Sequence, residues 1–473
     1  GDAPPIGFDE AILNGFAPDG GLFVPDTIPL FTHADLEDMA QLSYVDLAEK
    51  ITGVFIDPEI MPRQDLKKLI VDSFLHFGST ETAPVVPLEQ SDLYVQELFH
   101  GPTLSFKDIA MGFLINCMDY FLERKGEKLS LVLATTGDTG PAAAYASAGK
   151  RTLECWPLYP KDMISEEQER QMTTLDAPNV HPVGVEGCVN GGDDLDIIVA
   201  RLFADGERKK ELKLSSVNSI NWCRVMVQTV HYFFSYFKTV DMVGEKIIFS
   251  VPTGAFGNLC AGFVARAMGL PVKQFICATN DNGTLHRLFG KGILSKQELK
   301  QTVSSAIDIV VPYNFWRFLY FNCGQAPESV NMYMALLEKD GAIRFPDDLW
   351  NKLRQGFTSY SISDPDTLDT ISASYHGPDR YLLDPHGAVA VAAAKKYRAE
   401  NPGNDKIICL ATAHPAKFPI VIQQALGPEE NLPGAAIHPA LERAKKEFHH
   451  LRMCEYGNLE QALTSAMKRQ LHK

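Results

Sequence analysis

One lysine stands in a setting that suits covalent chemistry. Residues 100–108 read His-Gly-Pro-Thr-Leu-Ser-Phe-Lys-Asp, so Lys107 lies in a loop of small, hydroxyl and aromatic residues just before an apolar helical run. A lysine held there loses hydration, which favours its neutral, nucleophilic amine. Such an amine forms a Schiff base with a carbonyl, notably the aldehyde of pyridoxal 5'-phosphate (PLP). Because most lysines are solvated surface residues, the assignment of Lys107 depends on further motifs.

A second motif offers a binding loop for an anion. Residues 134–141 read Ala-Thr-Thr-Gly-Asp-Thr-Gly-Pro, between a strand-like run at 129–133 and a helical run at 142–146. The exposed amides and the dipole of a helix N-terminus suit an anion such as an amino-acid carboxylate. The alternative is an ordinary turn between strand and helix, with Asp138 or Thr139 as the helix cap.

A third motif has the composition of a phosphate-binding loop. Residues 252–258 read Pro-Thr-Gly-Ala-Phe-Gly-Asn and join the strand-like run 247–251 to a helical run at 259–265. The two glycines allow a close approach of the backbone to a ligand, and the loop leads into a helix N-terminus. It is neither a Walker A loop nor a complete Gly-x-Gly-x-x-Gly motif, so ATP and dinucleotides are poor candidates. Here too the alternative is a structural turn.

Taken in order, the three motifs resemble those of threonine synthase, a PLP-dependent family of the tryptophan-synthase-β fold group. Residues 218–224, Asn-Ser-Ile-Asn-Trp-Cys-Arg, and 410–418, Leu-Ala-Thr-Ala-His-Pro-Ala-Lys-Phe, are also similar to that family. The similarity runs from residue 15 to about residue 417 and looks like the longer form of the enzyme found in bacteria and fungi. It implies an α/β chain of PLP fold type II, with mostly parallel sheets, helices on both faces and an added N-terminal domain.

The resemblance also implies how the cofactor is held. Lys107 would bind PLP as a Schiff base and later move protons as the freed amine. Thr412 would lie near the pyridine nitrogen, and Asp138 would position the cofactor or a water molecule. The PLP phosphate would be bound by the third motif, at Gly254, Ala255, Phe256, Gly257 and Asn258.

Two further groups of residues are implied for the substrate. Thr135, Thr136 and Thr139 would bind its carboxylate, with help from backbone amides. Candidates for its phosphate are Ser219, Asn221 and Arg224, because arginine pairs with phosphate through two hydrogen bonds. The alternative for Arg224 is a buried ion pair inside a helix. We expect structural roles for His386 and His414, and no metal.

The implied reaction converts O-phospho-L-homoserine and water to L-threonine and phosphate, a step of threonine biosynthesis catalysed by a carbon–oxygen lyase. Lys107 would remove the α-proton and then a β-proton, the γ-phosphate would leave, and water would add at the β-carbon. A phospholyase of the same fold would instead release 2-oxobutyrate. A serine or threonine dehydratase is less favoured because it needs no site for a substrate phosphate. A non-catalytic PLP-fold binding protein is expected to lack Lys107, which is present.

The motifs must be positioned by alternating strands and helices, which favour a mostly parallel sheet. We expect an N-terminal domain at 1–90, a PLP-binding catalytic core of two subdomains at 91–430, with the smaller at about 127–240, and a C-terminal helical tail at 431–473. Residues 282–380 are rich in helix formers. Because ligands of open α/β sheets bind at the carboxyl ends of strands, the two glycine loops and segment 410–418 are expected to converge on one ligand. Further strands are expected at 93–98, 152–159, 179–185, 272–278 and 406–410.

Composition agrees with a globular enzyme. The chain has 473 residues and a net charge of −15, with no basic stripe that would favour a nucleic acid or an anionic membrane. No apolar run approaches the length of about 20 residues needed to span a bilayer, and no signal peptide is visible. The nine cysteines are scattered without Cys-x-x-Cys pairs, which favours a cytoplasmic location. The sequence predicts a small-molecule substrate and leaves the oligomeric state open.

Overall fold

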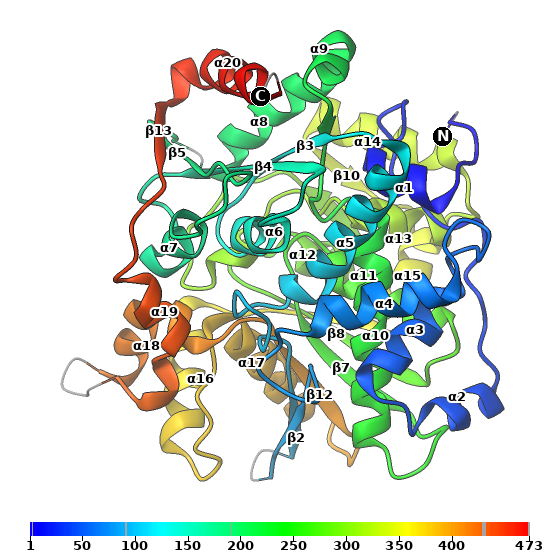
Figure 1. Cartoon of the computed structure of the whole chain (residues 1–473). Helices are drawn as coiled ribbons and strands as arrows, with labels where there is room; N and C mark the ends of the chain where they lie inside the picture. The colour runs from blue at the N-terminus through cyan, green and yellow to red at the C-terminus, as the bar shows by residue number, and fades with distance from the viewer. Residues whose placement is uncertain (2, 90–91, 190, 428–431, 472–473) are drawn as a thin grey trace.

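Two sheets organise the chain (Figure 1). The computed structural model describes residues 1–473 except 2, 90–91, 190, 428–431 and 472–473. The larger sheet has the strand order β1-β2-β12-β7-β8-β11 and the smaller one β13-β5-β4-β3-β6. The strands of the larger sheet are β1 (Val85–Leu88), β2 (Leu93–Glu97), β7 (Ile247–Pro252), β8 (Val272–Thr279), β11 (Phe357–Ser361) and β12 (Ile407–Ala411). Those of the smaller sheet are β3 (Leu129–Ala134), β4 (Leu153–Pro160), β5 (Val183–Glu186), β6 (Leu214–Ser215) and β13 (Arg452–Glu455).

Within these two sheets every neighbouring pair is parallel except β1 with β2. The central strands β7 and β12 are buried along their whole length, as expected for strands covered on both faces. Their apolar residues divide between two core clusters, because alternate side chains point to opposite faces. The predicted α/β class with mostly parallel sheets is confirmed.

The helices that carry the motifs lie between the two sheets in Figure 1. They are α5 (Lys107–Lys125), α6 (Thr139–Ser147), α10 (Trp222–Thr239) and α11 (Gly257–Ala267). Helix α5 packs against both α6 and α10, and α10 packs against α11. Helix α5 ends at Lys125, and Gly126 follows with φ +64°, the left-handed conformation that closes the helix. The three motifs and segment 218–224 therefore lie at the N-termini of helices that pack against one another.

The first part of the chain is helical. Its helices are α1 (Phe8–Asn14), α2 (His33–Met39), α3 (Tyr44–Gly53) and α4 (Arg63–Phe74). Thr32 begins α2 with a capping box, and Ser43 caps α3 through the amide of Asp46. Helices α1 and α4 pack on α5, and α3 packs on α10, so this region supports the helices of the motifs from one side.

Two further regions complete the core. The segment after β5 forms α8 (Gly192–Ala204) and α9 (Gly206–Glu211), and the segment before it forms α7 (Glu166–Thr173). The helix-rich region predicted at 282–380 also contains short strands. Its elements are α12 (Thr284–Lys291), β9 (Ile293–Ser295), η1 (Ser305–Ile307), α13 (Phe315–Asn322), α14 (Pro327–Asp340), β10 (Ala342–Arg344), α15 (Asp347–Leu353), β11 and α16 (Asp364–His376), and it is followed by α17 (Pro385–Glu400).

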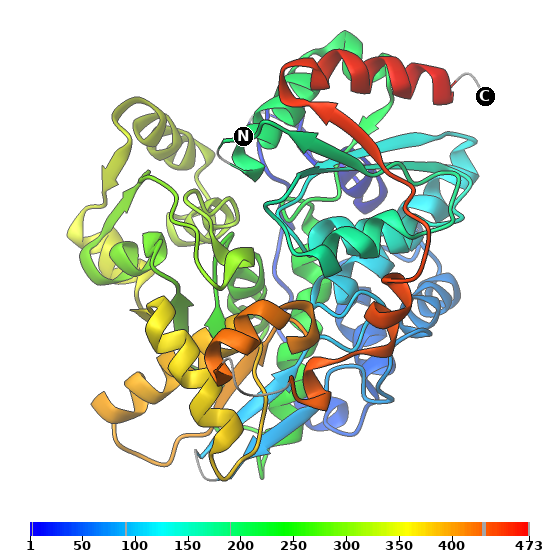
Figure 2. The same cartoon turned by 90° about the vertical axis from the view of Figure 1, so that its left-hand side faces the viewer.

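The C-terminal tail differs from a purely helical one. Between β12 and the tail lie η2 (Pro415–Lys417) and α18 (Pro419–Leu426). The tail predicted at 431–473 contains η3 (Gly434–Ala436), α19 (Pro439–Ala444), η4 (Tyr456–Asn458), α20 (Leu459–Leu471) and also strand β13. This strand pairs in parallel with β5 at the edge of the smaller sheet, as Figure 2 shows. Its short, largely exposed run of Arg, Met, Cys and Glu carries no alternating apolar pattern, so composition alone indicated helix.

The strand expected at 179–185 is shorter than predicted. Regular pairing begins only at Val183, because Pro182 has no amide hydrogen to donate to the sheet. Val180 makes an isolated bridge to Cys155, and the Asn179 side chain bonds the carbonyls of Ser147, Lys150 and Leu153 instead.

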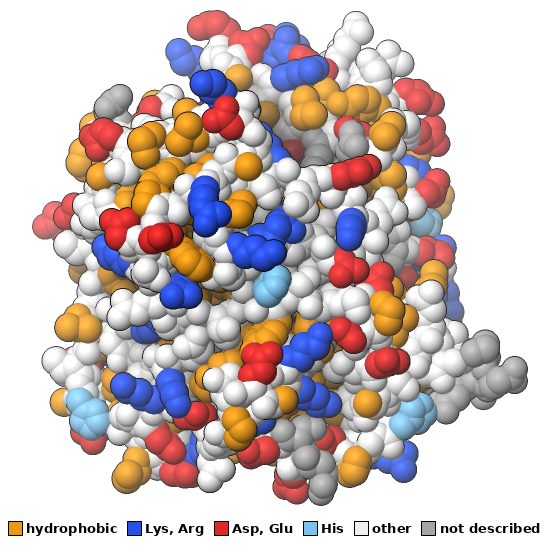
Figure 3. Space-filling view, turned by 180° about the vertical axis from the view of Figure 1, so that it is seen from behind, with side chains coloured by type: hydrophobic (Ala, Val, Ile, Leu, Met, Phe, Trp, Pro, Cys, Tyr) orange, Lys and Arg blue, Asp and Glu red, His pale blue; other side chains and the backbone are white. Residues whose placement is uncertain are grey.

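Surface features are unexceptional. Lys and Arg side chains alternate with Asp and Glu over the face seen in Figure 3. Within the described ranges, the chain has no helix of sufficient length and hydropathy to cross a bilayer. Nor does that part of the chain contain three grouped His, Cys, Asp or Glu side chains suited to a metal ion.

Candidate active site

The loop that carries Lys107 is paired with the loop that follows β12. The amide of Phe106 donates to the carbonyl of Thr412 (2.8 Å), and the amide of His414 donates to the carbonyl of Leu104 (3.0 Å). Leu104 adopts φ +62°, a left-handed conformation that costs a leucine roughly 1–2 kcal/mol. The pairing compensates this cost, and it brings Thr412 next to the lysine loop.

Asp108 closes the same loop from the inside. Its buried carboxylate accepts hydrogen bonds from the amide (2.8 Å) and the hydroxyl (2.6 Å) of Thr103. A Cβ on Gly101 would lie 2.3 Å from the Cβ of Asp108, so only glycine fits at position 101. Burial raises the pKa of Asp108 to about 6, against the opposing effect of the Thr103 bonds. The lysine loop is therefore fixed before Lys107, at Gly101 and Thr103, and directly after it, at Asp108.

Lys107 itself is the first residue of α5 and is half-buried. Its Nζ lies 4.5 Å from the centre of the Phe106 ring. Burial, followed by the guanidinium of Arg224, lowers the pKa of Lys107 to about 8, against the opposing effect of the Asp138 carboxylate. The amine is thus partly neutral near physiological pH, as a nucleophile requires. These mutual effects show that the structure brings together residues from three separate predicted motifs.

The loop after β3 is built around Thr135. Its hydroxyl accepts from the amides of Gly137 (3.2 Å) and Gly140 (2.9 Å), which shapes the turn into α6. Thr139 opens α6 and is half-buried, whereas Thr136 is exposed. Thr135 therefore has a structural task, because it accepts the Gly140 amide at the start of α6.

Asp138 occupies the N-cap position of α6 but does not cap it. Its side chain makes no hydrogen bond to the helix backbone. Instead its Oδ1 lies 2.6 Å from the Nζ of Lys417 and accepts from the Nε2 of Gln168 (3.0 Å). Although burial alone would raise the pKa of Asp138, the ammonium of Lys417 holds it below its ordinary value. The carboxylate is buried and ionised, and it is not used as a helix cap.

The loop after β7 forms the expected cradle. Phe256 adopts a left-handed φ of +66° at the N-cap of α11, and the helix has no side-chain cap. The buried Nδ2 of Asn258 has no hydrogen-bond partner, while its Oδ1 accepts from the hydroxyl of Tyr232 (2.7 Å). A Cβ on Gly254 would lie 2.9 Å from the Cα of Ile307, so glycine is required there. Uncapped amides beside an orphaned donor are the features expected of a phosphate-binding loop.

Asn314 and Arg317 join this cradle to segment 218–224. Asn314 donates its amide to the carbonyl of Ala255 (3.2 Å) and its side chain to the carbonyl of Ser219 (3.0 Å). Arg317 donates to the Asn314 side chain and to the carbonyls of Ile220 and Phe23. Sequence reasoning missed both residues, because they lie in the helix-rich region 282–380 without a recognisable motif.

Segment 218–224 places its three predicted residues differently. Asn221 caps α10 through the amide of Cys223 (3.2 Å) and donates to the carbonyls of Ile12 (2.8 Å) and Ser216 (3.4 Å). Both amide hydrogens of Asn221 are thus used within the protein. Ser219 is half-buried and has no such restriction.

Arg224 is buried without a counter-ion. Its side chain is 1% exposed, its Nη1 donates to the carbonyl of Val217 (2.8 Å), and its Nε has no partner. Within the described part of the chain, no carboxylate lies within 4 Å of it, so the alternative of a buried ion pair does not describe this arginine. Burial lowers the pKa of Arg224 to about 10. A buried guanidinium with unused donors is suited to an anion that comes from outside.

The two histidines considered earlier bond within loops. His386 pairs through Nδ1 with Asp384 (2.8 Å) and accepts the amide of Ala306 at Nε2 (3.1 Å). His414 accepts the amide of Ala416 at Nδ1 (3.1 Å), and burial lowers its pKa to about 4. Both arrangements agree with the structural roles expected for them.

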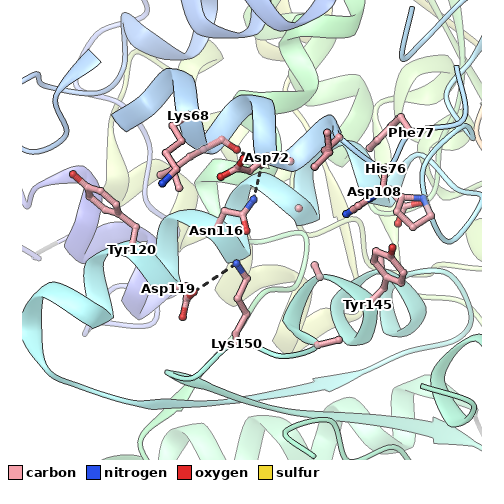
Figure 4. A pocket seen from close by; sticks show the side chains of 18 of the residues that line it. Lys68, Asp72, His76, Phe77, Asp108, Asn116, Asp119, Tyr120, Tyr145 and Lys150 are labelled. Atoms are coloured by element: carbon pink, nitrogen blue, oxygen red, sulfur yellow. Dashed lines mark hydrogen bonds and ion pairs between the residues drawn. The ribbon is translucent and has the colours of Figure 1, made fainter. Parts of the chain in front are cut away.

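A surface cavity of about 780 Å³ lies between α4, α5 and α6 (Figure 4). Its lining includes Asp108 and Pro102, so it reaches the back of the lysine loop. Lys107, Arg224 and the cradle do not line it. Lys150 pairs with Asp119 across its wall (3.5 Å). The cavity is therefore separate from the candidate active site, which is made from residues that converge on Lys107.

Comparison with known proteins agrees with this geometry. Residues 1–74 match the family described as threonine synthase N terminus, residues 75–413 match the pyridoxal-phosphate dependent enzyme family, and residues 387–461 match the threonine synthase C-terminal family. The threonine synthase of Eremothecium gossypii is 39% identical over 445 residues, which is 89% of this chain and 86% of that protein.

The chain belongs to the threonine synthase family.

Two other relatives extend the comparison. Threonine synthase-like 2 of Rattus norvegicus is 37% identical over 91% of this chain and 89% of that protein. The crystal structure of PLP-bound threonine synthase from Brucella melitensis has a TM-score of 0.91 and 35% identity, over 99% of this chain and 97% of that one. The predicted family, fold type and dependence on PLP are confirmed, and the protein is a PLP-dependent enzyme.

Proposed function

We propose that this protein is a lyase that converts O-phospho-L-homoserine and water to L-threonine and phosphate. The observation that carries the proposal is Arg224, a buried guanidinium without a carboxylate partner and close enough to Lys107 to lower its pKa. An anion-binding group beside a nucleophilic lysine is what a phosphorylated amino acid requires. A dehydratase acting on an unphosphorylated amino acid has no use for it.

The cradle and its surroundings fit PLP. The amides at the start of α11 and the unpartnered Nδ2 of Asn258 would hold the cofactor phosphate, with Gly254, Ala255, Phe256 and Gly257. The Thr412 hydroxyl would face the pyridine nitrogen, and Asp138 would hold the ring hydroxyl. When bound, PLP supplies an electron sink for the charge that develops at the α-carbon of the substrate.

The remaining steps are carried by side chains of the protein. The Nζ of Lys107 would hold the cofactor aldehyde, and the neutral amine freed by the substrate would accept the α-proton, give that proton back, and then accept a β-proton. Its lowered pKa of about 8 allows the same amine to take up and return protons near neutral pH.

Anion-binding groups orient the substrate at its two ends. Arg224, through Nε and Nη2, and the Ser219 hydroxyl bind the phosphate and stabilise it as a leaving group. The backbone amide of Thr139 and the Thr136 and Thr139 hydroxyls bind the carboxylate. Asn221 caps α10 with its side chain, and its carbonyl accepts the backbone amide of Arg224 (3.0 Å).

The test is to identify the carbon product. Holoenzyme is incubated with O-phospho-L-homoserine, and products are separated by chromatography beside a phosphate assay. Threonine and phosphate in equal amounts are expected, and Lys107→Ala protein should give neither. Phosphate with 2-oxobutyrate would show a phospholyase that uses the same site. No product from a protein with bound cofactor would refute the proposed substrate.

Two organisational features accompany this proposal. The division into domain 1–90, core 91–430 and tail 431–473 is supported by the helical N-terminal segment, whereas the two sheets cross its boundaries, because β1 pairs with β2 and β13 pairs with β5. A cytoplasmic location is supported by nine cysteines that all remain free thiols. Limited proteolysis and cell fractionation test these two points.

A further inference from the structure

Lys417 lies inside the candidate site although no role was assigned to it from the sequence. It ends η2, shortly after β12, and its side chain is fully buried. Its Nζ lies 2.6 Å from Oδ1 of Asp138 and donates to the carbonyl of Thr103 (2.9 Å). The partner carboxylate is only 3% exposed. Removing an ammonium group from water costs free energy, and its partners offset that cost only when their geometry is good.

The two contacts connect the segments that flank Lys107. Thr103 belongs to the lysine loop and is bonded to Asp108, the residue after Lys107. Asp138 belongs to the loop that follows β3 of the smaller sheet. Lys417 therefore spans from a loop of the larger sheet to a loop of the smaller one.

Helix α7 repeats this connection from the other side. Gln168 donates to Asp138 (3.0 Å), and Gln171 donates to the carbonyl of Thr103 (2.9 Å). Both glutamines are neutral, so they can orient the Asp138 carboxylate without balancing its charge. That balance comes from the cationic side chains that face it.

Three titratable side chains face Asp138. Lys417 approaches from η2, His386 from α17 and Lys107 from α5, while the facing residue of α7, Gln168, is neutral. His386 donates its Nδ1 hydrogen to Asp384 and accepts an amide at Nε2, which is the pattern of a neutral ring. Lys107 is consumed when it binds the cofactor. Lys417 is then the cation in contact with Asp138.

We propose that Lys417 is a positioning residue that keeps Asp138 ionised and fixed beside Lys107 while the enzyme works. The proposal rests on the roles given to Lys107 and Asp138 in the proposed function. Without Lys417, the largest effect that opposes burial is lost, which shifts the carboxylate toward its protonated form. Activity then depends on whether Asp138 has lost its proton.

The test compares holoenzymes with both partners changed singly and together. Lys417→Met, Asp138→Asn and the double variant are assayed for kcat/KM and for the absorbance of the lysine-bound cofactor between pH 5.5 and 9. Lys417→Met should show a new pH-dependent transition in both kcat/KM and absorbance. Its kcat/KM should fall about tenfold per pH unit below the pKa of Asp138 in that variant. The transition should vanish when Asp138→Asn is added, and the losses at neutral pH should not be additive.

Two control variants separate this role from mere packing. Lys417→Arg keeps the positive charge and should show no new transition. Lys161→Met breaks an ion pair between Lys161 and Glu169 of α7 (2.8 Å), which does not include Asp138, and should also show none. A new transition in either control, additive losses, or a folded Lys417→Met without the transition would overturn the proposal.

Folding failure is informative as well. If Lys417→Met does not fold, the double variant should, because it leaves no unpaired buried carboxylate. Failure of both would overturn a role that acts through Asp138. If Asp138→Asn has unchanged spectrum and kcat/KM, the role given to Asp138 in the proposed function fails, whatever Lys417 does.

Discussion

Replacement of Arg224 by methionine separates an anion-binding arginine from a structural one. The chain offers a matched control, since Arg317 is also 1% exposed and burial likewise lowers its pKa to about 10. The two differ in their partners. Arg317 donates to the Asn314 side chain and to two carbonyls, whereas Arg224 donates to one carbonyl and its Nε is unpaired.

The magnitudes follow from these contacts. A pKa near 10 for Arg224 corresponds to about 3 kcal/mol of unfavourable free energy for the charged form. Loss of the bond to Val217 costs roughly 1–3 kcal/mol, so Arg224→Met should leave the free energy of unfolding unchanged or raise it by up to about 2 kcal/mol. Arg317→Met relieves the same penalty of about 3 kcal/mol but breaks three bonds at roughly 1–3 kcal/mol each, so it should lower the free energy of unfolding by up to about 6 kcal/mol.

Although Arg224→Met should affect stability less than Arg317→Met, we expect it to impair catalysis severely. Two charge-assisted bonds to a substrate phosphate, at about 1.5–3 kcal/mol each, predict a loss of roughly 10²- to 10⁴-fold in kcat/KM. The assays are urea unfolding and phosphate release at varied substrate concentration. In addition, inorganic phosphate should raise the Tm of the parent protein and not of Arg224→Met. An Arg224→Met protein as unstable as Arg317→Met, with unchanged KM, would refute the reasoning.

Two further predictions concern the lysine loop. Because the Lys107 pKa is lowered to about 8, the rate of PLP incorporation into apoprotein should rise with pH and level off above about pH 8; a rise that continues beyond pH 9 would show an ordinary lysine. Asp108→Ala leaves the Thr103 amide and hydroxyl without an acceptor and should lower the free energy of unfolding by about 2–4 kcal/mol in urea, whereas Asp108→Asn should lose less; equal losses would show that the two bonds contribute little.

Much of the architecture follows from local patterns. The buried apolar runs at 129–133 and 247–251 predicted β3 and β7, and the glycine loops after them marked the starts of α6 and α11. These features are encoded within a few residues, because burial on both faces and turn chemistry are local requirements. The motif around Lys107, the residue proposed to be reactive, is local in the same way.

What could not be predicted depends on contacts between distant segments. Lys417 lies 279 positions from Asp138, and no property of a single lysine reveals a buried partner so far along the chain. Asn314 and Arg317 act through backbone carbonyls, which leave no sequence signal. The sequence did signal the role of Asn221, because asparagine before an apolar helical run is a preferred helix cap.

Strand β13 has a consequence for how the molecule behaves among its own copies. It covers the outer edge of β5, and an uncovered strand edge is a template for pairing with other chains. The segment from Arg452 onward supplies none of the groups proposed for catalysis. A chain terminated just before it would therefore keep its chemistry and expose the edge of β5, so the expected defect of such a truncation is self-association and poor solubility.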